Sequence, residues 1–351
     1  MFYHVITSTE CNLECKYCVR DEFTEIDENI DYCLPPKISY DVTKLKEFVT
    51  EDDYVTFYGG EPLLAIDDIK KIIDCVKCKG FMTQTNGLFL DKLGEYIKKF
   101  HTILISIDGD EEITDKNRGK GVFNKVMNNI CWIRENGFEG ELIARMTISK
   151  GSNVYDQVLF LSDNEFDGIH WQLDAMFFEE RNEWLKDYNE QIEKLVDEWI
   201  SRMHKGKVER WYPFMVLMDS ILKKEKSKLR CGSGYANYTI ATNGKVAACP
   251  IMCGYKKYYC GDIESNKLKE LYVAKPCSEC DILDLCGGRC LYSNITKLWK
   301  EEDYKELCGT IRFLIDKLKM KRAEVEELLN GGIIKEKDFE HLKFNGVEVI
   351  P

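Results

Sequence analysis

The sequence lacks three features that would each place it in a large class of proteins. It has no apolar run near the ~18 residues that a membrane-spanning helix needs. Its first residues, MFYHVITSTE, lack the basic segment and the long apolar segment of a secretory signal. It also lacks a basic excess, because 49 Lys and Arg stand against 61 Asp and Glu, giving a net charge of -12. We therefore expect a cytoplasmic protein with no nucleic-acid partner and no membrane partner.

Cysteine is the residue that the sequence has in excess. The 351 residues include 16 cysteines, of which three lie near the N-terminus and nine lie between 231 and 308. In a reducing compartment such a count indicates metal or redox chemistry rather than disulfides. The rest of the composition, 44% apolar and 31% charged with six Trp, predicts a folded chain with one large domain and a smaller one.

Short β-branched and aromatic runs alternate with helical stretches in the first part of the chain. The predicted strands cover 2–8, 54–59, 81–86, 103–108, 142–148 and 169–174. Helical periodicity follows at 66–76, 91–100, 123–137 and 155–163. Strand-then-helix units in this order predict a parallel sheet with crossover helices. Because six strands fall short of the eight in a closed barrel, we expect an α/β fold with a partial, TIM-like (β/α)6 barrel.

Composition changes along the chain suggest four segments. We expect the barrel over 1–200 and a charged helical bridge with a solvated face over 201–230. The segment 231–310 is rich in glycine and cysteine and has little room for an apolar core, so it needs metal to fold. A C-terminal helix and a polar tail follow over 311–351.

The N-terminal cysteines follow the first predicted strand. Cys11, Cys15 and Cys18 have the spacing C-x3-C-x2-C and lie in a long connection, and long loops in compact domains are usually functional. A closed zinc site or a fully ligated iron–sulfur cluster needs four protein ligands. Three thiolates can instead hold three corners of a [4Fe–4S] cube and leave one iron open to a substrate or cofactor. Half a zinc site is the alternative.

Three further strand ends carry short polar motifs. GGEP follows the second predicted strand at 59–62, TNG ends the third at 85–87, and SIDG ends the fourth at 106–109, with Arg118 beyond it. The carboxyl ends of parallel strands form the active sites of such folds. Taken alone, GGEP and TNG are compatible with ordinary turns. Ser106 alone would be compatible with a buried serine, and Arg118 with a surface arginine. Their order and spacing are what indicate one shared site.

Together these motifs resemble the radical S-adenosylmethionine (SAM) superfamily. The resemblance implies that Cys11, Cys15 and Cys18 hold a [4Fe–4S] cluster whose open iron binds the amino and carboxylate groups of SAM. Reductive cleavage of SAM would then yield methionine and a 5′-deoxyadenosyl radical that abstracts hydrogen from an unactivated C–H bond. The SAM contacts that the resemblance implies are Tyr17, Gly59, Gly60, Glu61, Asn86, Ser106, Asp108 and Arg118.

The C-terminal cysteines form a second pattern, C-x12-G-x4-C followed by C-x2-C-x5-C-x3-C and a last cysteine. This pattern resembles the SPASM extension of radical SAM enzymes, which holds two auxiliary [4Fe–4S] clusters. The implied ligands of the outer cluster are Cys277, Cys280, Cys286 and Cys308, and those of the inner cluster are Cys231, Cys249 and Cys290. A pair of zinc knuckles is the alternative, because C-x2-C pairs are also typical of zinc ribbons.

The inner cluster departs from the SPASM pattern at one ligand. A fourth ligand often lies a few residues before the first cysteine, and the stretch KKEKSKLR before Cys231 has none. Either Cys253 or Cys260 supplies it, or the cluster is open. The other cysteines are expected to be ordinary: Cys75 and Cys78 as thiols at a helix end rather than a redox pair, and Cys33 and Cys131 as structural residues. The aromatic stretch at 208–217 lines either a substrate channel or the core.

The SPASM resemblance implies an oxygen-sensitive enzyme that oxidatively modifies a ribosomal peptide or protein. Its partners would be that substrate and an electron donor such as a ferredoxin or flavodoxin. Pro250 follows Cys249 where sulfatase-maturing relatives place an aspartate, which argues against formylglycine formation. We also expect neither an N-terminal leader-binding domain nor a cobalamin domain. The alternatives are oxidation of a small molecule, such as a tetrapyrrole or cofactor precursor, and a non-catalytic iron–sulfur carrier.

Overall fold

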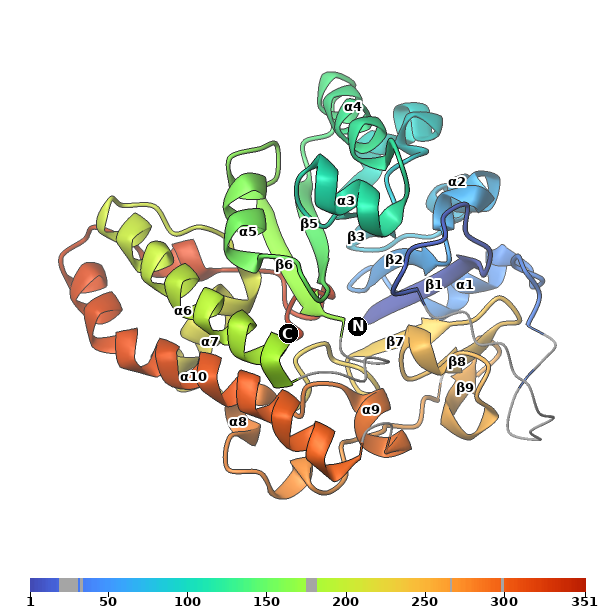
Figure 1. Ribbon diagram of the computed structural model, residues 1–351. Helices are drawn as coiled ribbons and strands as arrows, with labels where there is room; N and C mark the ends of the chain where they lie inside the picture. Colours follow the sequence, from blue (N-terminus) through green and yellow to red (C-terminus); the bar gives the residue numbers. More distant parts are fainter. Residues whose placement is uncertain (19–30, 32–33, 175–181, 266, 298–299) are drawn as a thin grey trace. The chain divides into compact units, whose positions relative to one another are not determined.

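The computed structural model describes residues 1–18, 31, 34–174, 182–265, 267–297 and 300–351 (Figure 1). They form two compact units, each assembled from segments that are distant in the sequence. Unit 1 comprises Met1–Ile107, Glu111–Ile143 and Gly232–Tyr272, and unit 2 comprises Asp108–Asp110, Ala144–Cys231 and Val273–Pro351. Cys33 lies outside the described residues. The predicted four-segment organisation stays a prediction.

The centre of unit 1 is a sheet with the strand order β4-β3-β2-β1-β7-β8-β9. Strands β1–β4 and β7 run parallel, whereas β8 and β9 are antiparallel additions. The cysteine-rich part of the chain supplies β7–β9, and β7 pairs with β1 so that Asn237 lies opposite Phe2. The strand bounds are β1 Phe2–Ser8, β2 Tyr54–Gly59, β3 Gly80–Thr85, β4 Phe100–Ser106, β7 Asn237–Ile240, β8 Lys245–Ala247 and β9 Tyr259–Asp262.

The strands and helices of unit 1 follow from the apolar pattern. Every residue of β1 is buried, as expected for an inner strand of a parallel sheet that is covered on both faces. In α2, which spans Ile66–Cys75, the side chains of Ile69, Ile72 and Ile73 form the buried stripe of an amphipathic helix. The other helices of this unit are η1 Val42–Lys44, α1 Leu45–Phe48, η2 Pro62–Ala65, η3 Leu90–Lys99, α3 Glu111–Arg118, α4 Val122–Glu135, η4 Pro250–Met252 and η5 Lys256–Tyr258.

The helix predicted over 91–100 is wrong in type. Leu90–Lys99 forms short 3-10 turns with a kink at Gly94, whose φ of 58° and ψ of -136° are not helical. Glycine adopts such a conformation without steric cost, so the α-helical ladder is interrupted although the apolar spacing is helical. The six predicted strands are all found, as β1–β4, β5 (Glu141–Ile148) and β6 (Gly168–Leu173), with ends shifted by up to three residues.

Unit 2 contains the second half of β5 and all of β6, together with helices. Helix α6 packs along α10, and α7 contacts both β6 and α10 (Figure 1). The bounds are β5 Glu141–Ile148, α5 Val154–Ser162, β6 Gly168–Leu173, α6 Asn182–His204, α7 Tyr212–Lys223, η6 Cys277–Glu279, α8 Leu283–Cys286, α9 Leu291–Thr296, α10 Glu301–Asn330 and η7 Glu336–Phe339. Among the described residues, every helix falls short of the length and apolarity that a membrane crossing requires.

The aromatic stretch at 208–217 belongs to the core of unit 2. The rings of Trp171, Trp199 and Trp211 surround Phe214, with centroid distances of 5.2, 5.7 and 6.2 Å. Each indole N–H donates a hydrogen bond, so these rings are buried without an unpaired donor. Ten of the twelve residues of α7 are buried. The expected solvated face is therefore wrong for this helix, and the core alternative for the aromatic residues is right.

The C-terminal part of unit 2 differs from the predicted helix and polar tail. Helix α10 begins at Glu301, so Cys308 lies on a helix rather than before one. The tail is packed rather than solvated, because Val347 and Ile350 are buried. Arg145 donates to the carbonyl oxygen of Gly346 at 2.7 Å, and His170 contacts that of Val349 at 2.9 Å. These contacts from side chains to backbone carbonyl oxygens hold the C-terminal tail in place. The composition of the tail alone does not indicate that it packs against the rest of the unit.

Candidate metal centres and cofactor site

The N-terminal cysteine loop lies in unit 1, directly after β1. Cys11 and Cys15 are half-buried and Cys18 is exposed. The backbone N–H of Leu13 donates to Cys11 Sγ at 3.4 Å, and that of Cys18 donates to the Cys15 carbonyl at 3.0 Å. These two bonds turn the chain tightly, so the C-x3-C-x2-C spacing forms a compact loop. The loop is tied to the end of α3, because the N–H of Lys16 donates to the carbonyl of Asn117 at 2.9 Å.

The two glycines after β2 allow that strand end to lie against the residues that lead into the loop. The N–H of Gly60 donates to the Ser8 carbonyl at 2.9 Å, and that of Glu61 donates to the Glu10 carbonyl at 2.8 Å. A Cβ atom on Gly59 would lie 2.0 Å from the Ser8 oxygen, and one on Gly60 would lie 2.4 Å from the Glu10 oxygen. Only glycine fits this approach of two backbones.

Glu61 connects the second and third strand ends. Its buried carboxylate accepts three hydrogen bonds, from Leu63 N at 3.0 Å, Thr85 Oγ1 at 2.6 Å and Asn86 N at 2.7 Å. Burial raises the pKa of Glu61, and these three donors act in the opposite direction. The Asn86 side chain then donates to Asn12 Oδ1 at 2.8 Å, next to Cys11. GGEP, TNG and the cysteine loop therefore form one hydrogen-bonded assembly.

The predicted SAM contacts are not all in this assembly. Tyr17 and Arg118 meet in unit 1, where the guanidinium carbon lies 5.4 Å from the ring centroid, a cation–π distance. Ser106 ends β4 in the same unit. Asp108 belongs to unit 2, where its Oδ1 accepts the N–H of Thr147 at 2.9 Å. Its predicted role at SAM stays a prediction.

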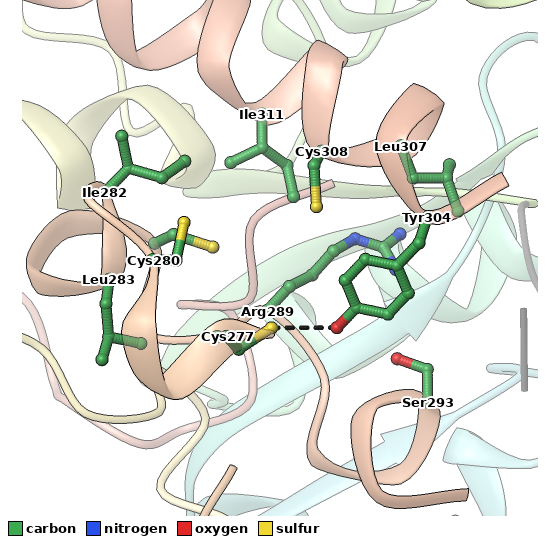
Figure 2. A pocket seen from close by; sticks show the side chains of 12 residues that line it. Cys277, Cys280, Ile282, Leu283, Arg289, Ser293, Tyr304, Leu307, Cys308 and Ile311 are labelled. Atoms are coloured by element: carbon green, nitrogen blue, oxygen red, sulfur yellow. Dashed lines mark hydrogen bonds between the residues drawn. The ribbon is translucent and has the colours of Figure 1, made fainter. Parts of the chain in front are cut away.

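The cysteines assigned to the outer cluster line one pocket in unit 2, as Figure 2 shows for Cys277, Cys280 and Cys308. Cys277 and Cys280 lie at the two ends of a 3-10 turn, Cys286 ends α8, and Cys308 comes from α10. The left-handed Gly287, with φ of 71°, ends α8 directly after Cys286. Consecutive turns thus explain how the C-x2-C-x5-C spacing presents three thiols to one pocket. Its apolar residues include Ile282, Leu283, Leu307 and Ile311.

The thiol environment of this pocket suits a buried metal cluster. Burial, together with the neighbouring Cys286 and Cys277 thiols, raises the pKa of Cys308 to about 12. Metal binding must therefore displace protons from closely grouped thiols. The lining residues include neither a carboxylate nor an imidazole. Four thiols line the pocket beside the hydroxyl groups of Ser293 and Tyr304, and four thiols suit an iron–sulfur cluster and also a four-cysteine zinc site. Among the described residues, no three His, Cys, Asp or Glu side chains are grouped around a single-ion position.

The cysteines assigned to the inner cluster belong to different units. Cys231 and Cys290 lie in unit 2, whereas Cys249 and its two candidate partners lie in unit 1. The thiol of Cys253 lies 4.0 Å from the Cys249 carbonyl, across the turn η4. Burial raises the pKa of Cys253 to about 12. Cys260 lies on β9 with its thiol 3.7 Å from the Tyr258 carbonyl. Cys253 therefore shares a turn with Cys249, and Cys260 does not.

The remaining described cysteines carry no sign of a shared site. The Cys75 thiol lies 3.7 Å from the Ile72 carbonyl of its own helix, and burial raises the pKa of Cys78 to about 11. Cys131, predicted to be structural, is exposed on α4, because its position falls outside the buried stripe that includes Ile130 and Ile133.

Residues 5–158 match the Radical SAM superfamily. The chain therefore contains a radical SAM domain, which implies SAM and a [4Fe–4S] cluster as cofactors. A serine-type anaerobic sulfatase-maturating enzyme of Bacteroides thetaiotaomicron is 25% identical over 347 residues, with 80% of each chain covered.

Solved structures show the same fold at lower identity. The structure of native anSMEcpe with bound AdoMet superposes with a TM-score of 0.69 at 19% identity, covering 93% of this chain and all of that one. Streptococcus suis SuiB bound to its precursor peptide SuiA gives a TM-score of 0.57 at 16% identity, with 84% and 72% covered. The predicted fold class, an α/β radical SAM fold with a parallel sheet, is confirmed.

The prediction missed several residues that form these sites. Asn12 and Thr85 hold the strand ends together, and Tyr304 contacts Cys277 in the outer pocket (Figure 2). Thr85 was inside the TNG motif and Asn12 was beside Cys11, so both had a local signal. Tyr304 had none, because it lies 27 residues from the cysteine that it contacts.

Proposed function

We propose that this protein is a radical SAM/SPASM enzyme that oxidatively modifies a ribosomal peptide or protein. The radical SAM domain supports the radical SAM part of this proposal. The SPASM part is supported by the pocket lined by Cys277, Cys280, Cys286 and Cys308 in the same chain. A second thiol-lined site would hold a cluster that accepts the second electron when the product requires removal of two.

The N-terminal assembly would hold the first cluster and SAM. Cys11, Cys15 and Cys18 would ligate three irons, and bound SAM would supply the 5′-deoxyadenosyl radical that takes a hydrogen atom from the substrate. Glu61 would support this site even without contacting SAM, because its three hydrogen bonds fix two strand ends beside the cysteine loop. Arg118 and Tyr17 would flank the nucleoside side of the site.

The C-terminal cysteines would receive the second electron. A substrate that has lost a hydrogen atom is a radical. It becomes a closed-shell oxidised product by losing one more electron and a proton, and the proton comes either from a neighbouring atom of the substrate or from the group that bonds to the radical carbon. The four thiols of the unit 2 pocket would hold the outer acceptor cluster. Cys231, Cys249 and Cys290 would hold the inner one, with Cys253 favoured over Cys260 as fourth ligand because it shares the turn with Cys249.

The relatives support a peptide substrate. Among the solved structures of similar fold, anSMEcpe is bound to the Cp18Cys peptide and SuiB to its precursor peptide SuiA. The electron that starts the reaction would come from a ferredoxin or flavodoxin. Pro250 after Cys249 continues to argue against formylglycine as the product.

The decisive experiment is anaerobic reconstitution of the full chain followed by metal analysis and mass spectrometry. We expect about twelve irons per chain for three [4Fe–4S] clusters and SAM-derived 5′-deoxyadenosine under reducing conditions. Replacing Cys11, Cys15 and Cys18 together by Ala should abolish that product, whereas Cys131→Ala, at an exposed thiol, should not. Stoichiometric zinc with only about four irons would contradict the SPASM assignment.

The substrate class needs a separate readout. Peptides encoded beside the gene should show a mass change when they are co-expressed with the enzyme, and none with the triple-alanine variant. Turnover of SAM together with a changed small molecule, and no changed peptide, would favour the cofactor-precursor alternative. Absence of SAM binding would favour the non-catalytic carrier.

A further inference from the structure

Two side chains of α10 donate hydrogen bonds toward the thiols of the outer pocket. Tyr304 Oη lies 2.9 Å from Cys277 Sγ (Figure 2), and Arg312 Nη2 lies 3.3 Å from Cys280 Sγ. These are the two cysteines of the C-x2-C pair. Neither contact is needed to close the turn itself, which the backbone bond from Cys280 N to the Cys277 carbonyl, at 3.1 Å, already forms.

The direction of the Tyr304 hydrogen bond is set by its other neighbour. Asn294 is buried, and its Nδ2 lies 3.5 Å from Tyr304 Oη. The Asn294 amide is itself fixed, because its Oδ1 accepts Ala274 N at 2.6 Å and its Nδ2 donates to the Ala274 carbonyl at 3.0 Å. An amide nitrogen only donates, so it occupies a lone pair of the phenol oxygen and leaves the phenol proton for sulfur. A thiolate at Cys277 accepts it.

Arg312 is held in place from the opposite side. Its Nη1 donates to Asp281 Oδ2 at 2.9 Å, and its Nη2 also contacts that carboxylate. Asp281 directly follows Cys280, so the ion pair holds the guanidinium beside the Cys280 sulfur. An arginine stays charged at any relevant pH, so this position supplies a charge-assisted donor to the Cys280 sulfur, while the Asp281 carboxylate, whose Oδ1 lies 3.6 Å from the same sulfur, offsets its positive charge.

We propose that Tyr304 and Arg312 are positioning residues that raise the reduction potential of the cluster held by Cys277, Cys280, Cys286 and Cys308. The inference rests on the proposed function, which supplies that cluster. A reduced cluster carries one more negative charge than an oxidised one, and its ligand sulfurs are better hydrogen-bond acceptors. Hydrogen-bond donors at two of the four sulfurs therefore stabilise the reduced form more than the oxidised form. The outer cluster would then accept the electron that the substrate releases.

The test is a redox titration followed by electron paramagnetic resonance, in a background where Cys11, Cys15 and Cys18 are Ala. Only auxiliary clusters remain there, so their potentials can be read without the SAM-binding cluster. We expect Tyr304→Phe and Arg312→Gln each to reduce the equilibrium constant for reduction of one cluster about tenfold, a shift of about 59 mV to more negative potential. The same cluster should respond to both variants.

Arg322→Gln is the matched control. Arg322 lies on the same helix and pairs with Glu326 at 2.8 Å, away from the pocket, so its loss should leave every potential unchanged. Arg312→Lys keeps the charge and should give a smaller shift than Arg312→Gln. Unchanged potentials in Tyr304→Phe and Arg312→Gln would overturn the proposal.

Iron content separates this proposal from the proposed function. If the parent protein holds no cluster that depends on Cys277 and Cys280, the SPASM assignment itself fails. If that cluster forms in the parent protein but is lost in Tyr304→Phe or Arg312→Gln, the residue holds the pocket together rather than setting the potential, and the inference fails for that residue.

Discussion

Glu61 and Asn86 are joined by a 2.7 Å hydrogen bond from the Asn86 backbone to the buried Glu61 carboxylate. The bond joins the end of β2 to the end of β3, and Asn86 carries the connection on to Asn12 in the cysteine loop. A single carboxylate thus fixes the relative positions of strand ends that are separated by 25 residues of chain. Buried acidic groups are stable only with such partners.

Glu61→Gln should destabilise the protein and weaken cluster loading. Glutamine matches the carboxylate in shape but brings an NH2 group opposite a backbone N–H, either at Leu63 or at Asn86. Leaving such a buried donor unpaired costs about 1–3 kcal/mol. We expect a decrease of that size in the free energy of unfolding, measured on reduced apoprotein in denaturant. Glu95→Gln, at an exposed residue paired with Lys98, is the control and should change little. Equal effects in the two variants would contradict the anchoring role.

Gly60→Ala should disrupt the cysteine loop. The new Cβ would lie 2.4 Å from the backbone oxygen and 2.6 Å from the carbonyl carbon of Glu10, so the chain entering the loop must move. We expect loss of the N-terminal cluster, seen as about four fewer irons per chain, together with loss of 5′-deoxyadenosine formation. Gly309→Ala offers a contrast, because that helical glycine has open space around its Cβ position. It should be tolerated and gain up to about 1 kcal/mol of stability. Full iron content in Gly60→Ala would show that the strand ends are not tightly coupled.

Much of the fold could be predicted from the sequence because local patterns determine it. The six strands and the helices α2, α4 and α5 have clear periodicity and lie where the pattern predicts them. The kink at Gly94 could not be predicted, since a helical apolar spacing is compatible with α or 3-10 turns and the left-handed φ of one glycine decides between them. Strand β7 pairs with β1 across more than 230 residues, and pairing at that distance leaves no local signature.

The candidate sites, like the fold, could be predicted from the sequence only in part. The cysteines of the outer pocket were predicted together because their pattern resembles the SPASM extension, and the turns of η6 and α8 present three of them to the pocket. The groups that surround them, Tyr304 and Arg312, depend on which face of α10 packs over the pocket. The packing of α10 against α6 and α7 determines that face. No short sequence motif indicates this packing. The buried C-terminal tail was missed for the same reason.

Cys308→Ser should remove the outer cluster and leave the radical chemistry. Cys308 is one of four thiols in the pocket, and serine is a poor ligand for iron–sulfur clusters. We expect iron to fall by about four per chain, with SAM cleavage retained and the modified peptide lost. Cys131→Ser, at an exposed thiol, should retain all three properties. A Cys308→Ser enzyme that still modifies its peptide would exclude the outer cluster as electron acceptor.

His170 should make the stability of the protein depend on pH. Burial holds the pKa of this histidine well below its usual range, and the adjacent Arg145 lowers it further. Arg145 Nη1 lies 2.6 Å from His170 Nδ1, and the Val349 carbonyl lies 2.9 Å from Nε2. Because arginine only donates and a carbonyl only accepts, the neutral ring with its proton on Nε2 is the form that fits. A second proton would have to face the guanidinium.

The sign of the effect follows from the protons that each state binds. An unfolded histidine takes up a proton below pH ~6.5, whereas the folded one stays neutral until the pH reaches its much lower pKa. Unfolding therefore takes up a proton in that window, and the free energy of unfolding should fall by up to about 1.4 kcal/mol per pH unit as the pH decreases. In His170→Gln, which cannot titrate, this component should be absent. Denaturant unfolding of both apoproteins between pH 5 and 8 measures it: their slopes against pH should agree above about pH 7.5 and diverge below pH ~6.5. Parallel slopes throughout would mean that His170 takes up its proton in the folded state, and that the packed tail yields to admit it.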